Sequence, residues 1–297
     1  MTWSVLHFGL MTVILHCGVL IRCSSGANIL ISLTNAMSTK SHSYSLARIA
    51  EGLIERGHYV TVLAASNKGT MGFRKSSHND SIIYPIPYTR EETDALQDSF
   101  TRVSFRKQSI LDYAEVLPVA QEFFGVVAAG CKSLFAQPSH LQRLRNRSFH
   151  AIIGIPFCPC DALLAEYLNI SFIAFTATFR YETFNEELLG IPTPNAYVPF
   201  PLYEALTDEM TFLQRLYNLF YRFAFVKYLT YVWSKPFVAL QMEHNISTKL
   251  TIREILGKTQ LWLAHTNFAL DFPRPTAPAW VPVGGLLAKP PDPLQQV

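Results

Sequence analysis

The chain has 297 residues, 49% hydrophobic and 16% charged, so it can bury a sizeable core in one large domain or in two. Its formal net charge is +3 and it contains no long run of Lys or Arg, which argues against binding to a nucleic-acid backbone. Three cysteines lie past residue 26: Cys131, Cys158 and Cys160. An odd number cannot form a complete disulfide framework, and their spacing does not match a zinc site. Core packing is expected for Cys131.

Residues 1–26 have the pattern of a secretory signal peptide. An apolar stretch runs from Val5 to Ile21, and small residues suited to cleavage precede Ala27. An uncleaved membrane anchor is the alternative, and either one would direct the rest of the chain into the secretory route. Four Asn-X-Ser sequons favour the same route and predict a glycoprotein: Asn79, Asn146, Asn169 and Asn245.

The most informative segment runs from Asn28 to Ala64. Its two β-rich apolar runs, 28–33 and 59–63, predict strands. Between them, apolar side chains three and four residues apart predict an amphipathic helix that ends at Gly57: Leu46, Ile49, Ala50, Leu53 and Ile54. His42 lies where the first strand's carboxyl end meets this helix, which is where open α/β sheets bind ligands. An imidazole at that place is a candidate general base.

The rest of the chain continues the alternation of strands and helices. Residues 90–148 look mainly helical, and Pro159 begins a further helix that covers 161–168. Further strands are predicted at 82–87, 150–154, 171–175 and 261–263. This order predicts an α/β fold, a Rossmann-like parallel sheet with helices on both faces.

The segment 211–233 is rich in aromatic residues and is interrupted by Arg215, Arg222 and Lys227, which makes it a poor membrane-spanning helix. An aromatic helix with basic residues is typical of a segment that lies on a membrane surface. A core or interdomain helix, with its aromatic side chains packed inside, is the equal alternative.

Several short motifs, taken in their order and spacing, resemble the amino-terminal half of the animal UDP-glucuronosyltransferases, which are GT-B glycosyltransferases. The similarity runs from about Asn28 to Leu294. The motifs that carry it are Ser41-His42, Arg56-Gly57-His58, Pro156 with Pro159-Cys160 before a Leu-Leu-Ala-Glu helix, Tyr197-Val198-Pro199, Met210 to Arg215, Phe272-Pro273-Arg274-Pro275 and Val283-Gly284-Gly285-Leu286.

The resemblance implies an acceptor-binding domain at 27–285 and the start of an interdomain linker at 286–297. It implies sugar transfer from a UDP-sugar, a co-substrate rather than a cofactor, to a small lipophilic acceptor, with inversion and without a metal. His42 would take the proton from the acceptor hydroxyl, assisted in the family by an Asp at the end of a later strand. Ser41 and Tyr197 would contact the acceptor, although core packing is an alternative for Tyr197.

One departure from the family pattern lies in this assisting carboxylate. With Pro156 and Pro159-Cys160 as anchors, Ile155 stands where the family has the Asp. An isoleucine side chain can neither orient an imidazole nor stabilise its charged form. Asp161 is the nearest carboxylate in the sequence and a weak candidate for the orienting role. Its simpler interpretation is a first-turn acid that complements the helix dipole.

A second departure is that the motifs of the donor-binding half are missing, so the UDP-sugar would bind only if that half were supplied. Whether the chain is an enzyme is therefore open. We expect a UDP-glucuronosyltransferase-like protein, inactive as this isolated half. The alternative is a non-catalytic truncated homologue that binds apolar ligands or modulates full-length family members.

The same resemblance predicts where the protein resides and what it meets. The expected location is the lumen of the endoplasmic reticulum, in association with its membrane. Expected partners are a lipophilic acceptor, the membrane surface through 211–233 and other family members in homo- or hetero-oligomers. No nucleic-acid partner is expected.

Overall fold

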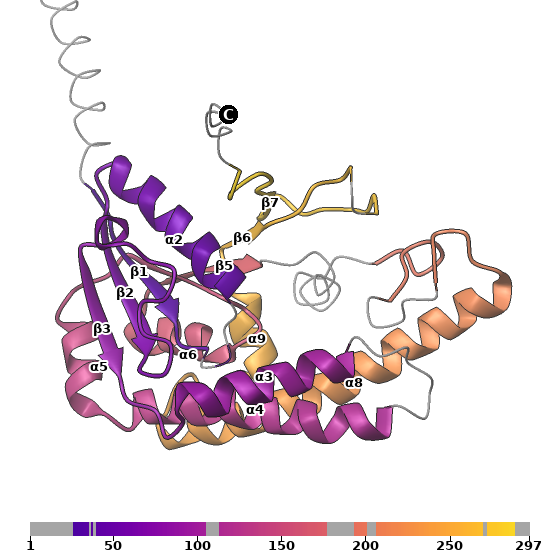
Figure 1. Cartoon of the computed structure of the whole chain (residues 1–297), viewed down its shortest axis with the longest axis horizontal. Coiled ribbons are helices and arrows are strands. Elements are labelled where there is room, and N and C mark those ends of the chain that lie inside the picture. Colours follow the sequence, from indigo (N-terminus) through magenta and orange to yellow (C-terminus); the bar gives the residue numbers. More distant parts are fainter. Residues whose placement is uncertain are drawn as a thin grey trace, which may run out of the picture.

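The computed structural model describes residues 26–35, 37, 40–104, 113–176, 193–200, 206–269 and 272–288. These residues form a seven-stranded, all-parallel sheet in the order β3-β2-β1-β4-β5-β6-β7 (Figure 1). The strands are β1 (Asn28–Leu33), β2 (Tyr59–Ala65), β3 (Asp80–Tyr84), β4 (Ala151–Gly154), β5 (Ser171–Thr176), β6 (Leu261–Ala264) and β7 (Trp280–Pro282). The predicted fold class, a Rossmann-like α/β sheet, is confirmed.

Helices cover both faces of this sheet. They are α2 (Lys40–Glu55), the 3₁₀ turn η1 (Lys75–Ser77), α3 (Arg90–Ser104), α4 (Tyr113–Phe135), α5 (Pro138–Arg145), α6 (Pro159–Leu168), α8 (Phe212–Glu243) and α9 (Ile252–Gly257). Helix α2 lies on one face, while α4, α6, α8 and α9 pack on the other, and α3, α4 and α8 run together below the sheet (Figure 1).

The alternation of side chains along β1 explains the two layers. Leu30 joins the cluster that packs against α4 and α6, whereas Ile31 joins the cluster under α2. β1 pairs with β2 on one side and with β4 on the other, and the strand order reverses direction between β1 and β4. In open parallel sheets the crevice at the carboxyl ends of two such strands is the usual ligand site.

The predicted βαβ unit is confirmed. Gly57 has a φ of +82°, the left-handed conformation that glycine adopts without strain, and it ends α2 as expected. Gly26 contacts the same turn, because a Cβ added to Gly26 would lie 1.9 Å from the carbonyl oxygen of Gly57. The start of β1 is thus packed tightly against the start of β2.

Three features differ from the sequence-based expectations. Cys131 is buried in the core as expected, but it also forms a disulfide that was not predicted, between α4 and Cys160 of α6, with a Cα–Cα distance of 5.6 Å. The odd count hid this pair, since Cys158 is a buried free thiol. Strand β7 and helix α9 were not predicted from the sequence. The predicted signal peptide, residues 1–26, lies outside the described residues except for Gly26.

The aromatic segment 211–233 lies almost entirely in α8. Thr211 caps this helix. Its hydroxyl accepts a hydrogen bond from the backbone amide of Gln214, and the Gln214 side chain accepts one from the backbone amide of Thr211. Among the described residues, no single helix is long and apolar enough to cross a membrane, and one bent pair, α4 from Pro118 with α5, passes on length and composition.

Candidate active site

The first predicted site residue, His42, lies in the first turn of α2, the helix that follows β1 in the chain. Its side chain is half-buried, and Ser41 beside it is exposed. Burial lowers the pKa of His42 from its usual value to about 4, because a charged imidazolium is poorly solvated there. The partial positive charge of a helix amino terminus also disfavours a cation at this position. At neutral pH the ring is therefore uncharged and able to accept a proton.

Asp161, in the first turn of α6, is fully buried at the carboxyl ends of β1 and β4. Its Oδ1 accepts hydrogen bonds from Ser32 Oγ at 2.5 Å and from Thr34 Oγ1. Its Oδ2 accepts a bond from the backbone amide of Ile155 at 3.0 Å. Burial raises the pKa of Asp161 to about 6 in spite of these donors.

The backbone of β4 leaves room for this carboxylate. A Cβ added to Gly154 would lie 2.1 Å from Asp161 Oδ2, so a larger residue at position 154 would displace the acid. Ser32 lies two residues after Leu30 and therefore on the same sheet face, the face that packs against α4 and α6. Asp161 thus bonds to β1 from the side opposite α2.

Ile155 follows β4 with its side chain in the apolar cluster beneath α2, next to residues such as Ile31 and Leu46. The position that the family resemblance assigns to the orienting Asp thus faces the helix that carries His42, but it holds a hydrocarbon. The side chain of Asp161 and that of Ile155 lie on opposite sides of the sheet end, joined by the hydrogen bond to the Ile155 amide. Whether Asp161 assists His42 stays a prediction.

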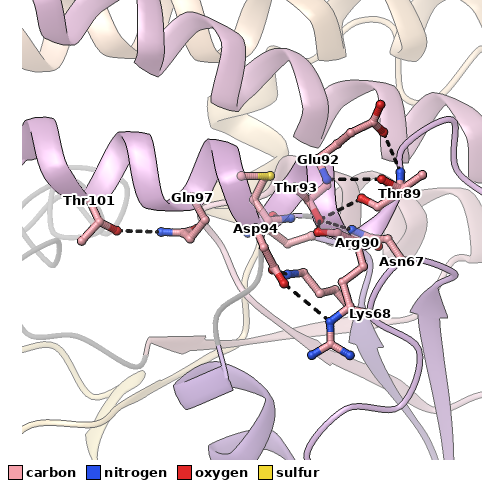
Figure 2. A network of polar contacts seen from close by, with 11 residues as sticks. Asn67, Lys68, Thr89, Arg90, Glu92, Thr93, Asp94, Gln97 and Thr101 are labelled. Carbon is pink, nitrogen blue, oxygen red and sulfur yellow. Dashed lines mark hydrogen bonds and ion pairs between the residues drawn. The ribbon is translucent and has the colours of Figure 1, made fainter.

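The segment after β2 packs against the residues that follow His42 in α2. A Cβ added to Gly72, whose φ is +85°, would lie 3.2 Å from Ser43, so this loop packs directly against the first turn of α2. Figure 2 shows how the same loop is fastened to α3: Lys68 pairs with Asp94, and Asn67 Nδ2 donates to Thr93 Oγ1 at 3.1 Å.

The start of α3 is itself well capped. The amide of Glu92 donates to Thr89 Oγ1 at 3.2 Å, and the Glu92 carboxylate accepts from the Thr89 amide at 2.8 Å (Figure 2). The hydrogen bond from Lys68 to Asp94 is the main reason that the pKa of Asp94 is lowered. These contacts fix the loop that packs on Ser43 to the helix that follows β3.

Tyr197 is not brought to this place by the described structure. It lies in the segment 193–200, which runs beside the first half of α8, away from β1 and α2 (Figure 1). Asn218 of α8 holds this segment by donating to the carbonyls of Asn195 and Val198, each at 2.9 Å. Tyr197 is partly exposed, and its contact with an acceptor stays a prediction.

Sequence reasoning missed the two hydroxyl groups that bind Asp161. Ser32 and Thr34 are polar residues at the end of an otherwise apolar strand, and that interruption of the pattern is the signal that could have found them. Within the part of the chain that the structure describes, no group of three or more His, Cys, Asp or Glu residues is arranged to hold a metal ion.

The parallel α/β sheet, with a neutral histidine near the carboxyl end of β1 where the strand order reverses, defines the class, that of Rossmann-like proteins. The family model described as "UDP-glucoronosyl and UDP-glucosyl transferase" matches residues 31–297. The chain therefore belongs to the UDP-glucuronosyl- and UDP-glucosyltransferase family, as the motifs predicted.

Individual relatives agree with this assignment. UDP-glucuronosyltransferase 2B1 of Rattus norvegicus is 33% identical over 266 residues, which are 86% of this chain and 48% of the relative. UDP-glucuronosyltransferase 1A1 of Homo sapiens is 28% identical over 264 residues, 86% of this chain and 47% of the relative. The chain thus spans about half the length of the curated relatives that it matches.

Solved structures are more distant. The glycosyltransferase VinC in complex with dTDP is 12% identical, with a TM-score of 0.47, and the match covers 86% of this chain and 52% of VinC. CalG4, the calicheamicin glycosyltransferase, is 12% identical, with a TM-score of 0.44 over 88% of this chain and 52% of CalG4.

Proposed function

We propose that residues 27–285 are the acceptor-binding domain of a GT-B glycosyltransferase and that 286–297 begin the linker to a donor-binding half. Joined to that half, the domain would transfer a sugar from a UDP-sugar to a small lipophilic hydroxyl compound. The observation that carries this proposal is the position of His42, half-buried and uncharged at the carboxyl end of β1, in a chain of this family.

In the proposed reaction a ring nitrogen of His42 takes the proton from the acceptor hydroxyl as its oxygen attacks the anomeric carbon. The bond from that carbon to the UDP oxygen breaks, and UDP leaves with the bonding electron pair. One displacement inverts the configuration and requires no covalent intermediate. A histidine with a pKa of about 4 is a weak base, so acceptors with acidic hydroxyls, such as phenols, would react best.

The second candidate function is a non-catalytic one, in which the chain binds apolar ligands or modulates full-length relatives. One observation favours it: the position of the orienting acid is filled by Ile155, which is buried among apolar side chains. Under this alternative the chain binds the lipophilic compound but does not support transfer, even with a donor half present. By itself, the chain is proposed to be inactive under both candidates.

Binding of an acceptor to the isolated chain tests the part that both candidates share. Titration of small phenols against the intrinsic tryptophan fluorescence should give saturable binding, and a bulky substitution beside the base, Ser41→Trp, should weaken it at least about tenfold. The matched control is Ser139→Trp, which replaces an exposed serine on α5. Absence of saturable binding across a panel of lipophilic phenols would contradict the proposal.

We also propose that the protein resides in the lumen of the endoplasmic reticulum as a membrane-associated glycoprotein and that it assembles with itself or with family members. The location is supported by the relatives, which are named UDP-glucuronosyltransferases. Glycosylation is supported by the exposure of all four sequon asparagines: Asn79, Asn146, Asn169 and Asn245. Digestion with a glycosidase that removes high-mannose glycans would shift the electrophoretic mobility of the expressed protein if this proposal holds.

A further inference from the structure

The first two-thirds of α8 present an apolar stripe to solvent, dense from Phe212 to Phe223 and resumed at Tyr231. The residues of this α8 stripe are between 49% and 78% exposed: Phe212, Leu213, Leu216, Leu219, Phe220, Phe223 and Tyr231. Most of them recur three and four residues apart, which places them on one face of the helix. Soluble monomers rarely expose an apolar patch of this kind unless it binds something.

Buried residues on the other side of α8 contact the rest of the protein and fix how the helix is turned. Asn218 is buried and makes three hydrogen bonds to the segment 193–200, one of them accepted from the Phe200 amide at 2.7 Å. Further along, the indole of Trp233 donates to the carbonyl of Phe157 at 2.7 Å. The orientation of the stripe is thus set by buried polar contacts.

Within α8 the charges have one sign until the last residue, Glu243, while two exposed acids, Asp208 and Glu209, lie just before the helix. From Phe212 to Met242 the sequence contains four basic residues and no acidic one: Arg215, Arg222, Lys227 and Lys235. Arg222 is buried on the inner face, but the other three are exposed. The ammonium group of Lys227, one turn after Phe223 on the same side of the helix, lies 5.9 Å from the ring centre of Phe223. Cations beside exposed aromatic side chains are what an anionic lipid surface attracts.

The shape of the element fits a flat surface. The stripe extends over about 30 Å at 1.5 Å per residue, and the amino-terminal end of α8 projects beyond α4 and away from the sheet (Figure 1). Because basic residues divide the segment, the helix suits the interface between water and lipid rather than the hydrocarbon interior.

We propose that the α8 stripe docks on a membrane surface that contains anionic lipid. The aromatic and leucine side chains enter the boundary between headgroups and acyl chains, while Arg215, Lys227 and Lys235 contact phosphate groups. This inference deepens the proposed membrane location and does not depend on glycosyl transfer.

Flotation with lipid vesicles tests the proposal. The chain expressed from Gly26, which lacks the apolar segment 1–25, should float with vesicles of phosphatidylcholine and phosphatidylserine, and less with phosphatidylcholine alone. The double variant Phe220→Glu, Phe223→Glu should bind both kinds of vesicle at least about tenfold more weakly. The double variant Lys227→Gln, Lys235→Gln should bind about tenfold more weakly to the anionic vesicles only. The matched control is Ile83→Glu, which replaces an apolar side chain that is 49% exposed on β3.

Each outcome decides the question. Equal flotation of the variant Phe220→Glu, Phe223→Glu and the wild type would overturn the proposal. It would also be overturned if the wild type did not bind vesicles but formed a dimer that Phe220→Glu dissociated. Equal binding to both vesicle types overturns the requirement for anionic lipid. Thermal unfolding shows whether the variants fold. Acceptor binding, measured on the same samples, should be unchanged, so a failure here is distinguished from a failure of the proposed function.

Discussion

His42 and Asp161 lie at the same end of the sheet, and burial favours the uncharged form of each. The pKa of His42 is lowered to about 4, and that of Asp161 is raised to about 6, so the two groups respond to acid in opposite directions. For His42 the neutral ring is favoured in the folded state, and its contribution to stability is lost as pH falls from 6.5 towards 4. For Asp161 the protonated acid is favoured, and its contribution is lost as pH rises through 6.

In the wild type, the effects of His42 and Asp161 on the pH dependence of the free energy of unfolding nearly cancel. A substitution that removes one of the two groups should therefore reveal the effect of the other. Between pH 7 and pH 4.5, His42→Gln should gain about 2 kcal/mol in free energy of unfolding relative to the wild type, and Asp161→Asn should lose about 2 kcal/mol relative to it. Urea unfolding at the two pH values measures both differences. Parallel pH profiles for all three proteins would show that neither group is perturbed by burial.

Residue 155 decides how strong a base His42 can be. Its side chain faces the layer of α2, so an acid there would approach the helix that carries the imidazole. In a chain completed with a donor-binding half, Ile155→Asp should raise the rate of transfer to an aliphatic alcohol between about tenfold and 10⁴-fold, the upper figure being the loss seen when a serine-protease triad is deprived of its carboxylate. Ile155→Asn is the matched control without charge. Equal transfer rates for the Asp and Asn variants would show that a carboxylate at position 155 does not assist His42.

At the level of elements, two histidines hold the start of β1. His58 Nδ1 accepts a hydrogen bond from the Ala27 amide, and His150 Nδ1 accepts one from the Asn28 amide, each at 3.0 Å. The histidine of the Arg56-Gly57-His58 motif thus has a structural use, because it ties the strand that leads to His42 to the start of β2. Both bonds require an uncharged acceptor nitrogen, which an imidazolium lacks.

Replacing either histidine by phenylalanine should therefore destabilise the fold, by about 1 kcal/mol for each lost hydrogen bond. His58→Asn and His150→Asn are the controls, since the amide oxygen of asparagine can occupy the place of Nδ1 and keep the bond. Denaturant unfolding at neutral pH compares the variants. Phenylalanine variants as stable as the asparagine variants would mean that these bonds contribute nothing.

The elements also show which contacts a sequence can reveal. Local periodicity was enough to predict the βαβ unit and most strands, because the apolar positions of 28–63 are set by burial within the unit itself. The pairing of Cys131 with Cys160 depends on α4 crossing α6, which no local pattern encodes. Likewise, the burial of Asp161 depends on the missing side chain of Gly154 and on hydroxyls from a strand more than 120 residues away.

At the scale of the whole molecule, the described structure is one sheet whose carboxyl edge carries His42, and α8 extends from that body with an exposed apolar face. The sequence predicted that segment 211–233 is an aromatic helix, but it did not distinguish a helix packed in the core from one that lies on a membrane surface. Only the folded chain distinguishes the buried face, set by Asn218 and Trp233, from the exposed stripe. Family membership covers 31–297, about half of the length of the curated relatives.

The general-base role of His42 is tested most directly by glycosyl transfer in a completed chain. Residues 27–297 would be fused to the donor-binding half of UDP-glucuronosyltransferase 2B1, the relative that is 33% identical, and UDP release would be measured with a phenol as the acceptor. His42→Ala should lower the turnover by about 10²-fold or more, while His140→Ala on α5 should leave it unchanged. A fusion that transfers sugar equally well without His42 would contradict the account.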